Sequence, residues 1–329
     1  MEKLLTIVIP SYNVEPYLRK GLDTMADSRL KETLEVLIIN DGSSDDTPGI
    51  AREYEKKYPE IFRLINKENG GHGSVINTGI KEAAGRYFRI IDGDDWVITD
   101  NLVKLIKKLA GTDADIIADK KSEIDMTTLK GELISLPKSA LPDKIYDIGQ
   151  VFEMDDMMQY FMIHIFSIKT QLLRDHNISV LEKVFYEDSE YVLKSISIAK
   201  SVQFIDLEIY QYMVGNVNQS VSTINFVKRY GNFDAVTKEM LKFSQDHHNA
   251  FVTSRVRNVI LTQYYIALIY NTDRKQGAKW AKELNAYLKL NYKFYYRLTR
   301  GRYRLDQILH ALGFDYEKLQ KLRKLLGKN

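Results

Sequence analysis

Tyr87-Phe88-Arg89-Ile90-Ile91-Asp92-Gly93-Asp94-Asp95 joins a short apolar run to a cluster of acidic residues. The apolar run has the length and the β-branched and aromatic content of a buried strand. Neighbouring carboxylates repel one another unless a cation or hydrogen-bond donors neutralise them, and oxygen ligands suit Mg²⁺ or Mn²⁺. The stretch therefore predicts a strand that ends at a candidate metal site. A helix N-cap followed by solvated acids would give the same pattern.

Similar apolar runs alternate with helical segments over the first part of the chain. The expected strands cover residues 4–10, 34–39, 62–65 and 87–91. The expected helices cover residues 17–25, a segment opened by Thr47-Pro48, and residues 73–84. This alternation predicts an α/β fold with a mostly parallel sheet and flanking helices.

Polar turns follow several of these strands. Asn40-Asp41-Gly42-Ser43 comes directly after the second strand, and ligands of parallel sheets gather at the carboxyl ends of the strands. Asp41 and the cluster at residues 92–95 would then converge on one crevice. The alternative is that Asp41 only closes an Asx turn by accepting hydrogen bonds from nearby backbone amides.

The segment Asn69-Gly70-Gly71-His72-Gly73-Ser74 resembles a loop that cradles phosphate. Glycine allows the backbone to approach an anion, and the following helix offers free amides. No Lys-Ser or Lys-Thr pair follows, so the segment is not a Walker loop. His72 could contact a diphosphate or a metal, or could be a structural histidine.

Composition narrows the class of protein and its compartment. The chain has 329 residues, 44% of them hydrophobic and 28% charged, which indicates a globular protein with a sizeable core. It has no cysteine, which excludes disulfides and thiolate metal sites and fits a cytoplasmic protein. The first residues show no secretory leader, so export is not expected.

From residue 225 onward the apolar spacing becomes helical, which predicts a catalytic domain at residues 1–222 and an α-helical part at residues 223–329. The last part, Lys293–Asn329, has ten Lys or Arg and three Asp or Glu, interleaved with leucines. Such a tail suits an anionic membrane surface, or a helix packed on its own domain or on a second subunit in a homodimer. It has no nucleic-acid-binding signature.

Four ordered motifs resemble those of the family 2 inverting glycosyltransferases of the GT-A fold. They are Ile9-Pro10-Ser11-Tyr12-Asn13, Ile39-Asn40-Asp41-Gly42-Ser43-Ser44-Asp45-Asp46-Thr47, Asn77-Thr78-Gly79 with Ala83 and Gly85, and Asp92-Gly93-Asp94-Asp95-Trp96. The resemblance continues through Phe185-Tyr186-Glu187-Asp188 and Tyr210-Gln211-Tyr212 to about residue 222. It implies a GT-A, Rossmann-like domain that binds a nucleotide sugar, with Mn²⁺ or Mg²⁺ as cofactor.

The resemblance also implies roles for individual residues. Asp188 would be the catalytic base, and Asp95 with Asp94 would bind the metal. Glu187-Asp188 could instead be the acidic first turn of a helix. The implied nucleotide-sugar site comprises Pro10, Tyr12, Asn13, Asp41, Asn69, Gly71, His72, Asn77, Asp92, Asp94 and Gln219. Trp96, His164 and Glu187 would lie on the acceptor side, although His164 could equally be structural.

The expected function is transfer of a hexose or N-acetylhexosamine from a UDP-sugar to a glycan, lipid-linked or protein-linked acceptor, as in bacterial surface polysaccharide synthesis. The enzyme would act in the cytoplasm or at the inner face of the membrane. One alternative is an inactive nucleotide-sugar-binding scaffold. Another is a nucleotidyltransferase, which normally carries a glycine-rich, basic loop after its first strand; Pro10-Ser11-Tyr12-Asn13 is not such a loop.

Overall fold

The computed structural model describes residues 3–215 and 222–325. The chain divides into two compact units, Met1–Val217 and Asn218–Asn329. The domain boundary expected after residue 222 lies slightly beyond this division.

The N-terminal unit is built on one ten-stranded sheet. Its strands are β1 (Leu5–Ser11), β2 (Leu34–Asn40), β3 (Phe62–Asn66), β4 (Tyr87–Ile90), β5 (Trp96–Val97), β6 (Ile116–Asp125), β7 (Gly131–Ile134), β8 (Ile145–Asp147), β9 (Phe166–Lys169) and β10 (Ser201–Val214). The strand order is β3-β2-β1-β4-β9-β6-β10-β5, with β7 beside β6 and β8 beside β10.

The first four strands form the parallel half of this sheet. β1 pairs in parallel with β2 and β4, and β2 pairs in parallel with β3. β9 then enters antiparallel between β4 and β6, and β10 returns parallel to β6. The predicted α/β class is thus confirmed, while the sheet beyond β4 is mixed.

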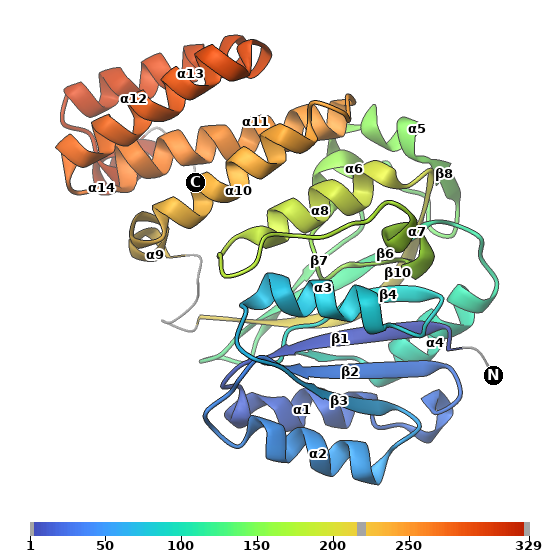
Figure 1. Ribbon diagram of the computed structural model, residues 1–329. Coiled ribbons are helices and arrows are strands. Elements are labelled where there is room, and N and C mark those ends of the chain that lie inside the picture. The colour runs from blue at the N-terminus through green and yellow to red at the C-terminus, as the bar shows by residue number, and fades with distance from the viewer. Residues whose placement is uncertain (1–2, 216–221, 326–329) are drawn as a thin grey trace. The chain divides into compact units, whose positions relative to one another are not determined.

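Helices cover both faces of the parallel half. The helical elements of this unit are α1 (Glu15–Met25), η1 (Ser28–Leu30), α2 (Thr47–Lys57), α3 (His72–Glu82), α4 (Thr99–Ala110), α5 (Ile148–Phe152), α6 (Asp155–Tyr160), α7 (Thr170–Asp175) and α8 (Glu187–Ile198). α1 and α2 lie on one face of β1–β3 and α3 on the other (Figure 1). Ile7 and Ile9 join the core with α1 and α2, whereas Val8 contacts Gly79 of α3, because successive strand residues face opposite sides.

The C-terminal unit is helical, as predicted. It comprises α9 (Thr223–Lys228), α10 (Tyr230–Phe243), α11 (Ala250–Tyr265), the π-helical turn η2 (Ile266–Tyr270), α12 (Arg274–Asn291), α13 (Lys293–Ala311) and α14 (Tyr316–Leu325). α11 supplies its centre, since Phe251, Val256, Ile260 and Tyr264 are fully buried. The apolar run from 259 to 270 thus lies in the last turns of α11 and in η2, and most of its residues are buried.

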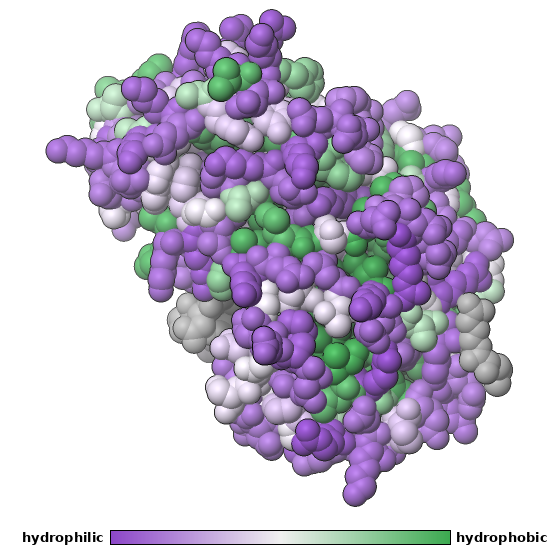
Figure 2. Space-filling model, viewed as in Figure 1, coloured by the Kyte–Doolittle hydropathy of each residue, from purple (hydrophilic) through white to green (hydrophobic). Residues whose placement is uncertain are grey.

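The visible surface is largely hydrophilic, with scattered hydrophobic residues (Figure 2). Within residues 3–215 and 222–325, no helix combines the length and the apolar character that a membrane span requires.

Candidate active site

The parallel half of the sheet brings the predicted polar turns to one edge. β2 and β4 flank β1, in register through Val8 with Leu37 on one side and Ile90 on the other. Asp41 follows β2 and donates its backbone N–H to the carbonyl of Ser11 at 2.9 Å. Asp92 follows β4 after one further residue. Both turns therefore lie at the same edge of the sheet, and their convergence on one crevice stays a prediction.

Asp41 is buried, with 2% of its surface exposed, and both oxygens of its carboxylate accept hydrogen bonds. It accepts hydrogen bonds from the amides of Gly70 at 2.9 Å and Gly71 at 2.8 Å. The ammonium group of Lys67 lies 2.7 Å from the same carboxylate. Asp41 therefore anchors the glycine loop in this structure. Its expected contact with a base stays a prediction.

The glycine loop leads into the N-terminus of α3. Gly71 has a φ of +81°, a conformation that costs glycine little and other residues more. A Cβ on Gly73 would lie 2.0 Å from the carbonyl oxygen of Leu181, so only glycine allows that segment to approach. Asn69 donates to the backbone carbonyl of Asp41 at 2.9 Å. The loop is thus held from both sides, with the first amides of α3 next to it.

The turn after β1 packs on the turn after β2. Asn13 adopts a φ of +53° and its side-chain oxygen accepts from the amide of Ser44 at 2.8 Å. Tyr12 is 54% exposed and Pro10 is half-buried. An exposed aromatic ring beside a fixed turn can stack on a planar ligand. These three residues are available for the base-binding roles that remain predicted for them.

The acidic cluster has the geometry of a cation site. One oxygen from each of Asp92, Asp94 and Asp95 lies within 4.8 Å of the others. Asp92 and Asp94 are half-buried, whereas Asp95 is 2% exposed. A Cβ on Gly93 would lie 2.8 Å from the carbonyl oxygen of Pro10, so the absence of a side chain lets the turn sit against β1.

Asp95 is held from β10. Its carboxylate accepts the amide of Met213 at 2.8 Å and the hydroxyl of Tyr210. Burial and the charges of Asp92 and Asp94 raise the pKa of Asp95 to about 8. Burial and the charge of Asp92 also raise the pKa of Asp94 to about 6. The cluster concentrates more negative charge than its protein partners stabilise, which is the electrostatic condition that a divalent cation relieves.

Two histidines flank Asp92. Nε2 of His72 lies 3.5 Å from one carboxylate oxygen of Asp92, and Nε2 of His164 lies 3.4 Å from the other. Burial alone would raise the pKa of Asp92, but His164 and His72 together lower it to about 2. Asp92 is therefore the member of the cluster that stays ionised most readily.

The two histidines differ in their pKa values. Nδ1 of His72 lies 2.6 Å from Oε1 of Glu187. Burial lowers the pKa of His72, but its bonds to Asp92 and Glu187 outweigh that effect and raise the pKa to about 10. Burial lowers the pKa of His164 to about 4, and its ring stacks on Tyr210 with centroids 4.7 Å apart. His72 is thus a cation between two carboxylates, and His164 is much the weaker base of the two.

α8 begins at the predicted acidic pair. Tyr186, just before it, has a φ of +74°, which is unusual for a bulky residue. Glu187 is 4% exposed and turned to His72, so in this structure it positions that histidine, and contact with an acceptor stays a prediction. Asp188 is exposed. The surrounding protein and the charge of Glu187 raise the pKa of Asp188.

The remaining expected residues occupy different surroundings. Asn77 exchanges two hydrogen bonds with the backbone of Val180, each 2.9 Å, and so clamps the segment before α8. Trp96 is half-buried, with the ammonium group of Lys20 2.9 Å from its ring centre. Gln219 lies outside the described residues.

Sequence reasoning missed two residues of this region. Lys67 follows β3 and pairs with Asp41, and its place after a strand of the parallel half could have revealed it. Tyr210 bonds Asp95 and stacks on His164. The motif containing Tyr210 was noted in the sequence, but nothing there indicates which acid it contacts.

Similarity to known proteins shows the family of this chain. The sequence profile of "Glycosyl transferase family 2" matches residues 6–174, just over half of the chain. The chain belongs to glycosyl transferase family 2. One similar protein is the "Uncharacterized glycosyltransferase EpsJ" of Bacillus subtilis, 29% identical over 218 residues. That alignment covers 64% of this chain and 61% of EpsJ, so the chain spans about three-fifths of this relative's length.

Solved structures show the same fold as this family 2 chain. S. aureus TarS 1-349 in complex with UDP-GlcNAc superimposes with a TM-score of 0.67 at 18% identity, covering 95% of this chain and 93% of TarS 1-349. The mannosyltransferase PcManGT of Pyrobaculum calidifontis in complex with GDP-Man and Mn²⁺ gives a TM-score of 0.53 at 15% identity, covering 94% and 88%. The expected GT-A architecture is thereby confirmed.

Proposed function

We propose that this family 2 glycosyltransferase moves a hexose or N-acetylhexosamine from a UDP-sugar to a glycan, lipid-linked or protein-linked acceptor, with inversion at the anomeric carbon. One observation carries the proposal: His72 contacts both Asp92 of the acidic cluster and Glu187, the neighbour of Asp188. This chain of contacts supports the proposal because it links the start of α8, where Asp188 lies, to the acidic cluster.

UDP is the donor nucleotide in this proposal. TarS, which shares the fold, was solved with UDP-GlcNAc. Tyr12 offers an exposed ring for the base, and Asp41 is the base-recognising acid expected from the family motif. The backbone amides at the start of α3 and the cationic His72 face the charge of the diphosphate. GDP and dTDP are the competing nucleotides.

The acidic cluster fits Mn²⁺ or Mg²⁺, since it offers only oxygen ligands within 4.8 Å of one another and raises the pKa of two of its acids. Asp92 and Asp94 are the more accessible ligands. Asp95 is already bonded to Met213 and Tyr210, and it would be the third ligand or would hold the turn that carries the other two. A bound dication supplies charge neutralisation for the departing diphosphate.

Asp188 is the proposed base. It accepts the proton of an acceptor hydroxyl while that oxygen bonds to the anomeric carbon. The bond between this carbon and UDP breaks with its electron pair leaving on the diphosphate, so a single displacement inverts the centre. Desolvation and the charge of Glu187 raise the pKa of Asp188, which makes its carboxylate a stronger base than a solvated aspartate. Trp96 and His164 are the proposed neighbours of the acceptor.

We further propose that α13 contacts an anionic membrane surface on the cytoplasmic side. Phe294, Leu298, Leu305, Ile308 and Leu312 recur at spacings of three, four or seven residues and are 41–69% exposed. A parallel row of exposed cations runs beside them: Lys293, Arg297, Arg300 and Arg304. Among the described residues none of these four cations has an ion-pair partner. An apolar stripe beside unpaired cations suits acidic lipid headgroups.

A second copy of the chain suits this stripe less well. The only acid of α13, Asp306, is buried and bonded to Arg302. If the apolar stripes of two copies of α13 packed together, the cations beside them would therefore find no acidic partner on the other copy. Charge reversal of Arg297, Arg300 and Arg304 should abolish sedimentation with phosphatidylglycerol vesicles. Reversal of Lys275, Lys282 and Lys289 on α12 is the matched control. Equal sedimentation of both variants would refute the membrane proposal, and concentration-dependent dimerisation through α13 would replace it.

The transferase proposal is tested by UDP release. Purified protein is incubated with UDP-GlcNAc, UDP-glucose or UDP-galactose, with Mn²⁺ or with EDTA, in the presence and absence of a bacterial lipid and glycan extract. We expect metal-dependent release from one donor, accelerated by the extract. Protein that binds UDP but releases none under any condition would support the inactive-scaffold alternative instead.

A further inference from the structure

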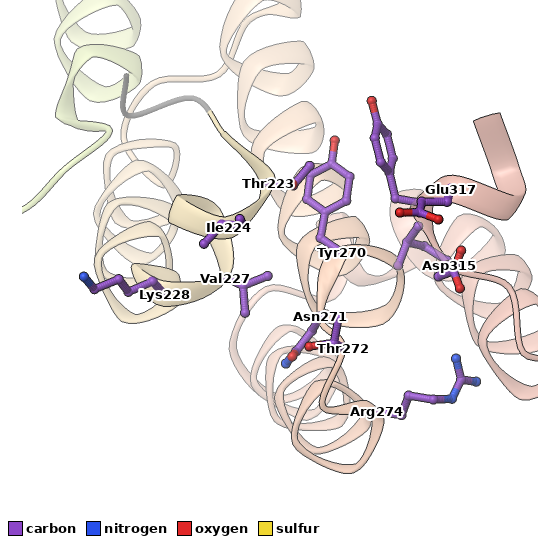
Figure 3. A pocket seen from close by; sticks show the side chains of 12 residues that line it. Thr223, Ile224, Val227, Lys228, Tyr270, Asn271, Thr272, Arg274, Asp315 and Glu317 are labelled. Carbon is purple, nitrogen blue, oxygen red and sulfur yellow. The ribbon is translucent and has the colours of Figure 1, made fainter. Parts of the chain in front are cut away.

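A pocket in the C-terminal unit has the composition of a saccharide site. It has a volume of about 680 Å³ and is lined by α9, the π-helical turn η2 with the segment after it, and the start of α14 (Figure 3). This volume falls in the range of small-molecule sites. All its lining residues belong to Asn218–Asn329, and none was assigned a role in donor binding or transfer.

Aromatic rings form part of the pocket wall. Tyr270 and Tyr316 meet edge to face, with ring centroids 5.1 Å apart, and Tyr270 also stacks on Phe226. Tyr270 and Tyr316 are only partly buried, so ring surface stays open to a ligand. Rigid aromatic faces of this kind pack against the C–H faces of sugar rings at low conformational cost.

Polar groups surround these rings. The lining includes the carboxylates of Asp315 and Glu317, the amide of Asn271 and the hydroxyl of Thr272. Glu317 has no hydrogen bond or ion pair among the described residues. Nδ2 of Asn271, in a residue 7% exposed, is likewise a donor without a partner in the described part of the chain. Unpaired carboxylates and amides are the groups that sugar hydroxyls bond.

The wall bearing Tyr270 is rigid. η2 is a π-helical turn, a rare element that occurs frequently at functional sites. Ile266, Ala267, Leu268 and Ile269 are buried in the core of the unit. A Cβ on Gly277 of α12 would lie 2.0 Å from the carbonyl oxygen of Ala267, so α12 packs directly on the turn. The turn therefore holds Tyr270 in place before a ligand binds, which lowers the cost of binding.

The charge of the lining selects among ligand classes. Lys228 and Arg274 balance Asp315 and Glu317, so the pocket has no cationic excess for a nucleotide. A lipid chain would cover the polar groups of Glu317 and Asn271 without giving them hydrogen-bond partners. We infer that this pocket binds a neutral oligosaccharide. This inference rests on the proposed glycan acceptor. The pocket would bind a segment of the acceptor chain other than the one that receives the sugar.

Titrations with triacetylchitotriose, maltotriose and cellotriose, followed by saturation-transfer NMR on the full chain, test the inference. Tyr316→Ala should weaken binding of the recognised trisaccharide about two- to tenfold. Glu317→Gln, which leaves the fold intact, should weaken it as well. Tyr296→Ala on α13, outside the pocket lining, is the matched control and should bind normally.

UDP binding with Mn²⁺ is measured on the same samples. Trisaccharide binding that Tyr316→Ala and Glu317→Gln weaken supports the pocket, even if UDP does not bind. Normal UDP binding with no response to any of the three trisaccharides would overturn the inference and leave the transferase proposal standing. Trisaccharide binding that neither substitution changes would also overturn it, because the sugar would then occupy another site.

Discussion

Two acidic turns lie at the same edge of the sheet, yet their electrostatic states are opposite. Asp41 after β2 has a cation and two backbone amides as partners. Asp94 after β4 lies beside two more carboxylates, and burial with the charge of Asp92 raises its pKa to about 6. The protein itself neutralises the carboxylate of the first turn, whereas the carboxylates of the second turn have too few cationic partners.

This difference separates an acid whose charge the protein neutralises from acids whose charge it does not. A buried carboxylate with matched donors stabilises the fold, and removing it exposes those donors to an apolar interior. A cluster of repelling carboxylates destabilises the empty protein and is stabilised by a ligand of opposite charge. Removal of an acid from the first turn should therefore affect folding, whereas removal from the second should affect binding.

The largest expected effect concerns a third acid, Asp188. Its substitution should stop sugar transfer without the loss of stability or of metal binding that is expected for the two turns. Asp188→Asn should lower sugar transfer about 10²–10⁴-fold, because no base then accepts the acceptor proton. UDP affinity should stay near that of the wild type. UDP release and calorimetric UDP binding are measured on the same preparation. Loss of UDP binding in this variant would move Asp188 to the donor site.

The next effect concerns stability. Asp41→Asn should lower the free energy of unfolding by about 2–4 kcal/mol, because Lys67 and the amides of Gly70 and Gly71 lose a charged acceptor. Chemical denaturation measures this value. Asp46→Asn in the same turn is the control, since Asp46 is exposed and should change stability by less than about 0.5 kcal/mol. An Asp41→Asn protein with the same free energy of unfolding as the wild type would contradict the stabilising role of Asp41.

A smaller effect should come from the metal alone. Mn²⁺ binding to the folded cluster should stabilise the wild type by about 1–3 kcal/mol at a large excess over its dissociation constant, seen as a higher Tm in calorimetry. Asp94→Asn should lose most of this gain, and its metal-free Tm should equal or exceed that of the wild type, because one repelling charge is removed. An equal rise in Tm for both proteins would place the metal elsewhere.

The elements that carry the turns could be predicted from the sequence. Leu5–Ser11 and Leu34–Asn40 form strands because dense β-branched residues fit a sheet buried on both faces, and the first strand ends one residue after Pro10. The helix after Asp46 begins at Thr47 as its proline indicates. The position of Asp41 and Asp92 at one edge follows from strand order alone.

The electrostatic state of each turn could not be predicted from the sequence. Lys67 reaches Asp41 across a loop, and Tyr210 reaches Asp95 from a strand more than a hundred residues away. The link from Asp92 through His72 to Glu187 depends on packing between α3 and α8, which periodicity does not reveal. Long-range contacts of this kind decide which carboxylate is satisfied.

Calorimetric titration with UDP, with and without Mn²⁺, tests the central claim most directly when it compares the wild type with Asp94→Asn. We expect Mn²⁺ to strengthen UDP binding by the wild type at least about tenfold, or about 1.4 kcal/mol, and to have no effect on the variant. The control Asp46→Asn should behave as the wild type. Full Mn²⁺ enhancement in a folded Asp94→Asn protein would contradict the assignment of the acidic cluster as the metal and donor site.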